Sequence, residues 1–212
     1  MENKRILITG SKGFLGSHLY KNLAEHNTVI EFEGDVRQPS SNLMNYNMVP
    51  DHFLRSKFDI VIHFAGQSDS DEYLDKQKTA TTIINGTINI LDIAKSHDAK
   101  FVFASTAGIY LANPGMVHET CKLAMEQYIR STYDNYIILR IPRVYDRTRT
   151  KGLMRKIRED KITKKDMHRR VEYITINQFL EQTLPLLTRD NIIYDYIIKE
   201  KNKIKEIKEL FG

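Results

Sequence analysis

Residues 5–16 read Arg5-Ile6-Leu7-Ile8-Thr9-Gly10-Ser11-Lys12-Gly13-Phe14-Leu15-Gly16. The apolar first half predicts a buried strand, and a segment of helical period follows it. Glycines three residues apart between a strand and a helix permit a tight turn, a close approach of backbone N–H groups to an anion, and close packing of the helix on the strand. The stretch therefore predicts a site for the pyrophosphate of a dinucleotide at a helix amino terminus. A glycine turn that binds nothing would show the same spacing.

Strands and helices are expected to alternate from the amino terminus to about residue 145. Continuous apolar strands separated by helices are typical of a parallel sheet covered on both faces. The expected fold class is therefore α/β, with a doubly wound, Rossmann-like parallel sheet. The sequence predicts strands at 5–9, 28–32, 58–64, 100–105 and 136–141, and helices at 15–25, 79–95 and 119–133, the second with Ile84, Ile88, Leu91 and Ala94 on one face.

The pattern is less regular after Ile141. A basic helix is expected near 152–159, another near 175–187, and a closing strand and helix between 192 and 211. A chain of 212 residues can bury one full hydrophobic core but is short for two independent domains. We therefore expect a single domain over 1–212, with a sheet core over about 1–145 and a small, abbreviated substrate lobe over about 146–212.

The composition argues against membrane and metal-binding proteins. Hydrophobic residues make up 41% of the chain, and no segment approaches the roughly 20 uninterrupted apolar residues of a membrane helix. No apolar signal segment follows Lys4 and Arg5. Cys121 is the only cysteine, so an internal disulfide is ruled out, and no Cys/His cluster predicts a metal site. We expect a cytoplasmic protein that uses no metal and contacts no membrane.

Positive charge is concentrated in one part of the chain. Residues 147–170 hold eleven Lys and Arg against three acidic residues, whereas the whole chain has a net charge of only +5. Such a segment attracts phosphate groups or nucleic acid, although a solvated, Lys-rich helix face has the same composition. It contains no Phe, Tyr or Trp on which bases would stack, so nucleic acid is not expected as a partner.

Three acidic residues, Glu31, Glu33 and Asp35, lie where the second predicted strand should end. A carboxylate at this place accepts hydrogen bonds from an adenosine ribose and repels a 2′-phosphate. The expected cofactor is therefore NAD, with NADP not excluded because Arg37 lies close by. Each of these acids is equally compatible with a solvated loop.

Six segments in colinear order resemble one known family. Besides Thr9 to Gly16, they are His63-Phe64-Ala65-Gly66, Gly86-Thr87-Ile88-Asn89, Ser105 to Tyr110, Leu139 to Tyr145, and Arg169-Arg170-Val171-Glu172-Tyr173-Ile174. In this order they are similar to motifs of the extended short-chain dehydrogenase/reductase family, which comprises NAD-dependent sugar-nucleotide epimerases, dehydratases and reductases. The resemblance implies a nucleotide-sugar substrate.

The resemblance also implies roles for individual residues. Lys122 would lie under the nicotinamide ribose and lower the pKa of the catalytic acid/base, and Thr106 would hydrogen-bond the reacting sugar hydroxyl. Cofactor contacts are implied for Gly10, Lys12, Gly13, Phe14, Leu15, Gly16, Phe64, Ala65, Gly66 and Lys122. Substrate contacts are implied for Ser68, Thr106, Arg143, Arg147 and Arg149, whose guanidinium groups suit a diphosphate.

The chain departs from this family at the acid/base. The family motif is Tyr-x-x-x-Lys, and counting back from Lys122 places His118 at the tyrosine. A histidine with a pKa near 6.5 exchanges protons around neutral pH, so His118 is a candidate acid/base, but it is also compatible with lost catalysis. Ile83 replaces the supporting asparagine, Asp146 replaces a glycine, and only eight positions separate Tyr110 from His118.

Two functions remain open at this stage. The first is an epimerase or reductase that acts by hydride transfer; 4,6-dehydration is the least expected reaction because Ala107 and Gly108 stand where dehydratases carry an Asp-Glu pair. The second is a dinucleotide-binding module that has lost catalysis and acts as a sensor or scaffold. Cys121 is expected to pack rather than to react. The resemblance further implies a possible homodimer through the helices at 79–95 and 119–133.

Overall fold

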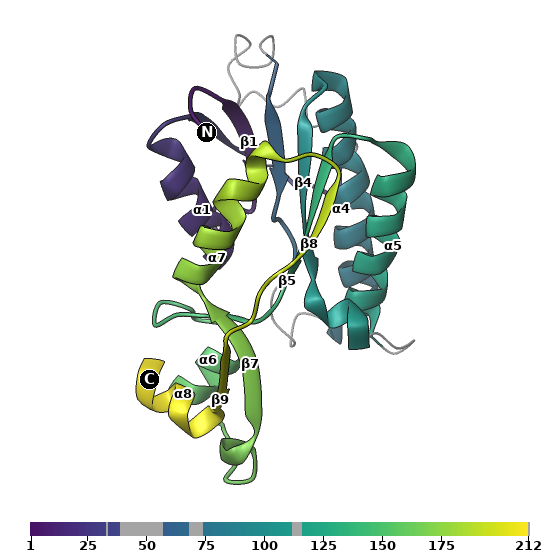
Figure 1. Cartoon of the computed structure of the whole chain (residues 1–212). Helices are drawn as coiled ribbons and strands as arrows, with labels where there is room; N and C mark the ends of the chain where they lie inside the picture. Colours follow the sequence, from purple (N-terminus) through teal and green to yellow (C-terminus); the bar gives the residue numbers. More distant parts are fainter. Residues whose placement is uncertain (33, 39–56, 68–73, 112–115, 212) are drawn as a thin grey trace.

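The computed structural model describes residues 1–32, 34–38, 57–67, 74–111 and 116–211, so Glu33 and Ser68 lie outside the described residues. A six-stranded parallel sheet forms its centre, with the strand order β2-β1-β3-β4-β5-β8 (Figure 1). The predicted doubly wound α/β class is confirmed. The strands are β1 (Arg5–Thr9), β2 (Thr28–Phe32), β3 (Ile60–His63), β4 (Lys100–Thr106), β5 (Tyr136–Ile141) and β8 (Ile192–Asp195).

Helices cover both faces of this sheet (Figure 1). One face carries α1 (Phe14–Ala24) and α7 (Ile176–Thr183), and the other carries α4 (Lys76–His97) and α5 (Val117–Thr132). Most element ends lie within three residues of the predicted bounds, and both α4 and α5 begin earlier than predicted. The Asp75 carboxylate accepts a hydrogen bond from the backbone of Lys78 and starts α4 before the predicted residue. Helix α5 begins two residues before the predicted Glu119.

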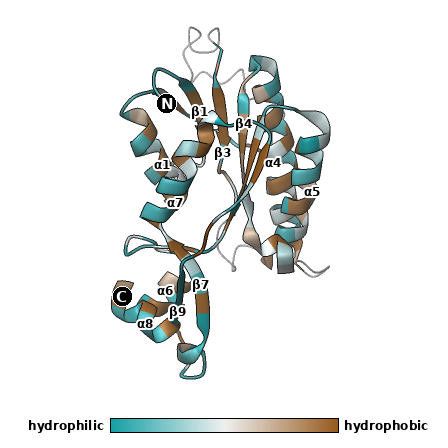
Figure 2. Cartoon of the chain, viewed as in Figure 1, coloured by the Kyte–Doolittle hydropathy of each residue, from teal (hydrophilic) through white to brown (hydrophobic). Residues whose placement is uncertain are grey.

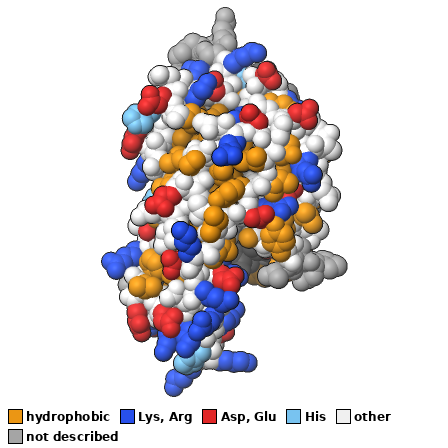
Figure 3. Space-filling model, viewed as in Figure 1, with side chains coloured by type: hydrophobic (Ala, Val, Ile, Leu, Met, Phe, Trp, Pro, Cys, Tyr) orange, Lys and Arg blue, Asp and Glu red, His pale blue; other side chains and the backbone are white. Residues whose placement is uncertain are grey.

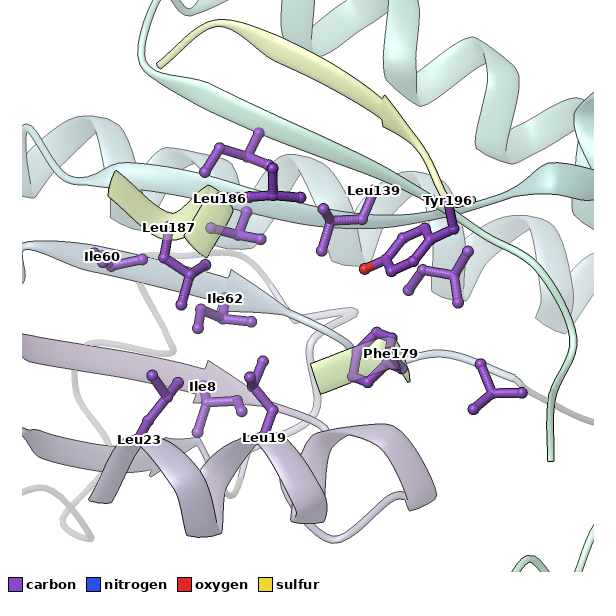
Figure 4. Close-up of a cluster of buried hydrophobic side chains, with 14 of the residues drawn as sticks. Ile8, Leu19, Leu23, Ile60, Ile62, Leu139, Phe179, Leu186, Leu187 and Tyr196 are labelled. Atoms are coloured by element: carbon purple, nitrogen blue, oxygen red, sulfur yellow. The ribbon is translucent and has the colours of Figure 1, made fainter. Parts of the chain in front are cut away.

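Successive residues of each strand point to opposite faces, and this alternation divides the core into two clusters. Ile8 and Ile62 face α1 and α7, whereas Leu7 and Val61 face α4 and α5. The middle strands of the sheet are accordingly hydrophobic over most of their length (Figure 2). In the first cluster, shown in Figure 4, Leu19 and Leu23 of α1 meet Phe179 of α7 and the sheet residues Ile8, Ile60, Ile62 and Leu139.

The predicted face of α4 needs a correction. Leu91 and Ala94 are buried as expected, but Ile84 and Ile88 are only half-buried. The fully buried row runs instead through Ile83 and Ile90, because these side chains point at the sheet while Ile84 and Ile88 lie at its margin.

A small lobe lies below the main sheet in Figure 1. Its three strands have the order β6-β7-β9, with β7 parallel to β6 and antiparallel to β9. The lobe has a small core of its own, in which Tyr145 stacks on Tyr173 with a ring separation of 4.9 Å. Its elements are β6 (Val144–Tyr145), α6 (Gly152–Arg158), a short 3₁₀ turn (Asp166–His168), β7 (Arg170–Thr175), β9 (Glu200–Lys203) and α8 (Ile204–Phe211).

Part of the segment assigned to the lobe by sequence joins the main sheet instead. The chain leaves the lobe at Thr175, which forms a capping box with Gln178 and starts α7. After α7, Pro185 opens the 3₁₀ helix η4 (Leu184–Thr188), so the predicted helix at 175–187 is divided in two. Strand β8 then pairs with β5 as the sixth strand. Among the described residues, no helix is long and apolar enough to cross a membrane.

Candidate active site

The glycine loop connects β1 to α1 and leaves no room for side chains. Gly10 has a φ of +73°, and a Cβ there would lie 2.6 Å from the backbone nitrogen of Ala65. A Cβ on Gly16 would overlap the carbonyl oxygen of Gly10, and one on Gly13 would lie 3.1 Å from the same oxygen. Gly13 is the N-cap residue of α1, and no side chain caps this helix. The first N–H groups of the helix therefore face this loop. The cradle fits an anionic pyrophosphate.

The other cofactor candidates surround this loop. Phe14 and Leu15 are half-buried in the first turn of α1, and Lys12 is exposed in the loop. Phe64 and Ala65 follow β3 and are half-buried, with Gly66 exposed beyond them. Since β2 and β3 flank β1 on opposite sides, the strand order reverses at this point, where doubly wound sheets bind ligands.

A buried polar clip joins the glycine loop to the turn after β3. The Thr9 hydroxyl accepts a hydrogen bond from the backbone of Ala65 and lies 2.8 Å from His63 Nδ1. His63 is almost fully buried, and burial together with the Lys122 charge lowers its pKa to about 3. His63 is therefore neutral at physiological pH, and it holds Thr9 without adding charge to the cradle.

The acidic residues at the end of β2 and beyond it have different environments. Glu31 is half-buried within β2. The Asp35 carboxylate receives three hydrogen bonds of 2.6 to 3.0 Å from the Arg37 side chain, which lowers the pKa of Asp35. The intervening Val36 is fixed on α4, because Asn89 donates a 2.9 Å hydrogen bond to its carbonyl. Arg37 thus already pairs with one of the three acids that were candidates for the ribose contact.

Thr106, His118 and Lys122 lie where β4 ends and α5 begins. Thr106 is the last residue of β4, and its hydroxyl accepts a 3.0 Å hydrogen bond from the backbone of Gly108 in the 3₁₀ helix η2 (Ala107–Leu111). His118 and Lys122 occupy successive turns of α5 on its buried face. The Lys122 ammonium donates a 2.6 Å hydrogen bond to the Ala104 carbonyl, so its chain runs along β4.

Burial shifts the charge states of both residues on α5. It lowers the pKa of Lys122 to about 8, partly offset by the negative charge of Glu126. Burial and the Lys122 charge lower the pKa of His118 to about 4. Lys122 thus acts in the direction expected for the acid/base, but the expectation that His118 titrates near neutral pH is wrong for the free protein. The imidazole is neutral at pH 7.

One buried network was missed by the sequence reasoning. Glu126, which is 2% exposed, accepts hydrogen bonds from Ser105 and from the guanidinium of Arg140 at 2.5 to 3.2 Å. Arg140 also donates to the Tyr110 hydroxyl, which in turn donates to Asp195 of β8. The network ties η2 and α5 to β5 and β8. Its one signal in the sequence is the four-residue spacing from Lys122 to Glu126.

The arginines predicted to bind a diphosphate do not share one site. Arg143 lines an open pocket of about 250 Å³ together with Arg169, Arg170, Val171, Glu172 and Lys201. Arg147 instead donates hydrogen bonds to the carbonyl of Leu210 in α8. Arg149 donates to the Val144 carbonyl and lies 5.2 Å from the Phe14 ring centre. Lys201 was not predicted. Figure 3 shows Lys and Arg side chains gathered on this lobe.

A sequence profile of the NAD dependent epimerase/dehydratase family matches residues 6–171, which include the glycine loop, Thr106, His118 and Lys122. The chain belongs to this family. The family resemblance seen in the sequence is thereby confirmed.

Known members of the epimerase/dehydratase family match about half of the chain. A UDP-glucose 4-epimerase of Pisum sativum is 29% identical over 133 residues, and a UDP-glucuronic acid decarboxylase of Danio rerio is 33% identical over 122 residues. Each alignment covers 51% of this chain, but only 38% and 29% of the respective relative. The chain therefore matches less than two fifths of the length of these relatives.

Solved structures show the same fold over nearly the whole chain. A dTDP-4-dehydrorhamnose reductase of Bacillus anthracis in complex with NADP has a TM-score of 0.79 at 18% identity, covering 100% of this chain and 80% of its own. A UDP-glucose 4-epimerase of Thermus thermophilus in complex with NAD has a TM-score of 0.76 at 20% identity, covering 97% and 81%. At these identities the similarity supports the fold and not the reaction.

Proposed function

We propose that the chain binds NAD, with NADP not excluded, and catalyses epimerisation or reduction of a nucleotide-activated sugar. The glycine cradle carries the proposal. Its three glycines leave backbone N–H groups open at the start of α1, beside the turn after β3. The residues that would hold the dinucleotide are Gly10, Gly13 and Gly16 at the pyrophosphate, Glu31 or Asp35 near the adenosine ribose, and Lys122 near the nicotinamide ribose.

When bound, the dinucleotide supplies a hydride acceptor or donor. The protein's own residues then orient the sugar and move its proton. The Thr106 hydroxyl positions the reacting sugar hydroxyl, and His118, neutral at pH 7, accepts the proton of that hydroxyl. Lys122 keeps a positive charge near the reacting oxygen.

The pocket around Arg143 is proposed to hold the substrate diphosphate. Arg143, Arg169, Arg170 and Lys201 supply four cationic side chains against the single carboxylate of Glu172, which is already paired with Lys201 at 2.7 Å. Guanidinium groups at such density suit the oxygens of two linked phosphates. Arg147 and Arg149 donate hydrogen bonds to backbone carbonyls elsewhere and do not belong to this proposed diphosphate site.

A second candidate is a dinucleotide-binding module without catalysis. Two observations favour it: the Lys122 ammonium is engaged by the Ala104 carbonyl, and Ile83 is buried at the position where the family places a supporting asparagine. In that case the cradle and the cation-lined pocket would bind their ligands with no turnover.

The two candidates are separated by measuring binding and turnover with the same protein. NADH and NADPH are titrated by fluorescence, and UDP- and dTDP-sugars are screened for changes in cofactor absorbance and for epimer formation. Sugar-dependent turnover excludes the non-catalytic module, binding without turnover supports it, and failure to bind either dinucleotide rejects both. Arg143→Gln should weaken binding of UDP about 10-fold, whereas the matched control Arg147→Gln should leave it unchanged.

We also propose a homodimer through α4 and α5. The half-buried apolar side chains of Ile84 and Ile88 on α4 and of Tyr128 on α5 support this surface. Light scattering of the purified protein tests it, with Ile88→Glu expected to give monomers.

A cytoplasmic location is also proposed, since the sequence has a single cysteine and needs no oxidising compartment.

A further inference from the structure

Tyr145 carries a buried hydroxyl that has no role in the function proposed above. The residue belongs to β6 and is only 3% exposed, with its ring stacked on that of Tyr173 at 4.9 Å. Within the part of the chain that the structure describes, the Tyr145 hydroxyl makes no hydrogen bond, whereas the Tyr173 hydroxyl donates one of 3.3 Å to Asn202. A buried hydroxyl without a partner destabilises a fold, and a ligand that supplies the missing partner would remove this cost.

The lobe strands turn Tyr145 toward two arginines of the pocket. Side chains alternate along a strand, so Arg143 and Tyr145 share one face. Arg169 is extended just before β7 and shares its face with Tyr173, on which Tyr145 stacks. Burial raises the pKa of the Tyr145 hydroxyl to about 12, against the opposing charges of Arg143, Arg149 and Arg169. The hydroxyl therefore lies near the end of the pocket that Arg143 and Arg169 line.

The groups around this hydroxyl lack a hydrogen-bond acceptor. Among the described residues, the side chains of Arg143, Arg169 and Arg170 make no hydrogen bond and no ion pair, and Glu172, the acidic residue of the lining, is already held by Lys201 at 2.7 Å. Guanidinium groups only donate hydrogen bonds, whereas a phosphate oxygen accepts them. A phosphate group at this end of the pocket would therefore satisfy the guanidinium groups and the hydroxyl together.

The hydroxyl oxygen is covered in the free protein. Arg143 and Arg169 are themselves exposed, so their guanidinium groups can turn toward an anion without disturbing the core of the lobe. This movement would open a path to the hydroxyl.

We propose that Tyr145 is a ligand-binding residue of this pocket, and that its hydroxyl donates a hydrogen bond to a phosphate oxygen held between Arg143 and Arg169. The inference rests on the diphosphate site proposed above and adds a neutral donor to its cationic ones. The ligand is a phosphate or diphosphate group, because an uncharged nucleoside offers no anionic oxygen to the guanidinium groups.

Two matched variants test the hydroxyl. Tyr145→Phe and Tyr173→Phe each remove one hydroxyl from the same stacked pair and keep both rings. Inorganic pyrophosphate, UDP and uridine are titrated by calorimetry. Tyr145→Phe should weaken the binding of pyrophosphate and of UDP about 10-fold, as expected for one lost hydrogen bond to a charged group. Tyr173→Phe should leave both affinities unchanged, and uridine should not bind with measurable affinity to any of the three proteins.

Urea unfolding of the free protein gives a second readout, in the opposite direction. Tyr145→Phe removes an unpartnered hydroxyl and should not lower the free energy of unfolding, whereas Tyr173→Phe loses the hydrogen bond to Asn202 and should lower it. Added pyrophosphate should raise the free energy of unfolding more in the wild type than in Tyr145→Phe, because it binds the folded wild type more tightly.

Three results would overturn the inference. They are equal pyrophosphate affinity in Tyr145→Phe and the wild type, no pyrophosphate binding by the wild type, and a lower free energy of unfolding in free Tyr145→Phe, which would show that the hydroxyl already has a partner. If Arg143→Gln weakens pyrophosphate binding and Tyr145→Phe does not, the proposed diphosphate site stands without Tyr145. Absence of NADH binding or of sugar turnover rejects the proposed function, and the pyrophosphate titration still decides the role of Tyr145.

Discussion

Lowering the pH from 7 to 5 is expected to destabilise the folded protein through His63. This side chain is almost fully buried between β1 and the aromatic rings of Phe101 and Phe103, each 6.2 Å from the imidazole centre. Its pKa is lowered to about 3 by burial and by the Lys122 charge. In the unfolded chain, by contrast, the imidazole titrates near 6.5.

The direction and the size of the change in stability with pH follow from these two pKa values. Between pH 6.5 and 3 the unfolded chain binds a proton at His63 that the folded protein does not bind, so stability falls as the pH falls through this window. With a folded pKa of about 3, linkage removes about 2 kcal/mol from the free energy of unfolding between pH 7 and pH 5. His97 and His118, whose pKa values are also lowered, add to the total loss.

The variant His63→Asn isolates the contribution of His63. Asparagine keeps a polar atom near Thr9 but does not titrate. Urea unfolding is measured at pH 7 and pH 5 in both proteins, and the loss of stability between the two pH values should be about 2 kcal/mol smaller in the variant. The difference between the proteins cancels the shared effects of His97 and His118. An equal loss in both proteins would refute the buried, neutral state of His63.

Three further outcomes are expected. Gly16→Ala should lower the free energy of unfolding by about 1 to 3 kcal/mol in urea and abolish NADH binding, because its Cβ would overlap the carbonyl oxygen of Gly10. The control variant Gly13→Ala should fold normally and only weaken NADH binding. Glu126→Gln should cost about 3 kcal/mol, because it leaves the half-buried Arg140 without its ion-pair partner; removing the exposed Glu172 should cause no measurable change. Lys122→Met should raise the pKa of His118 in an NMR titration, and an unchanged value would contradict the charge coupling.

The first five strands and three helices were predictable because their signals are local. Each strand contains a run of apolar residues, and α1 and α4 are bounded by glycine or polar residues. Long-range pairing carries no such signal. The run Ile192-Ile193-Tyr194 fits a lobe strand as well as a sheet strand, and its place beside β5 is decided by where α7 carries the chain.

The sequence predicted the backbone arrangement of the glycine loop better than it predicted the positions of the long side chains. The glycine cradle depends on residue order alone, and Gly10, Gly13 and Gly16 lie together as the spacing indicates. Arg143 and Arg147 are only four residues apart, but one lines the lobe pocket and the other binds the end of α8. A side chain of this length can reach in several directions, so its position along the sequence does not reveal its partner.

Helix α5 connects the stability of the fold to the charge of the site. Lys122 and Glu126 lie one turn apart on its buried face, and Glu126 is held by Arg140 of β5. Glu126 raises the pKa of Lys122 against the effect of burial, and Lys122 in turn lowers the pKa of His118. A change at Arg140, which pairs with Glu126, is therefore expected to alter how strongly Glu126 acts on Lys122. The effect of substituting Arg140, Glu126 or Lys122 should therefore be measured both on the titration of His118 and on the free energy of unfolding, because these residues contribute to both.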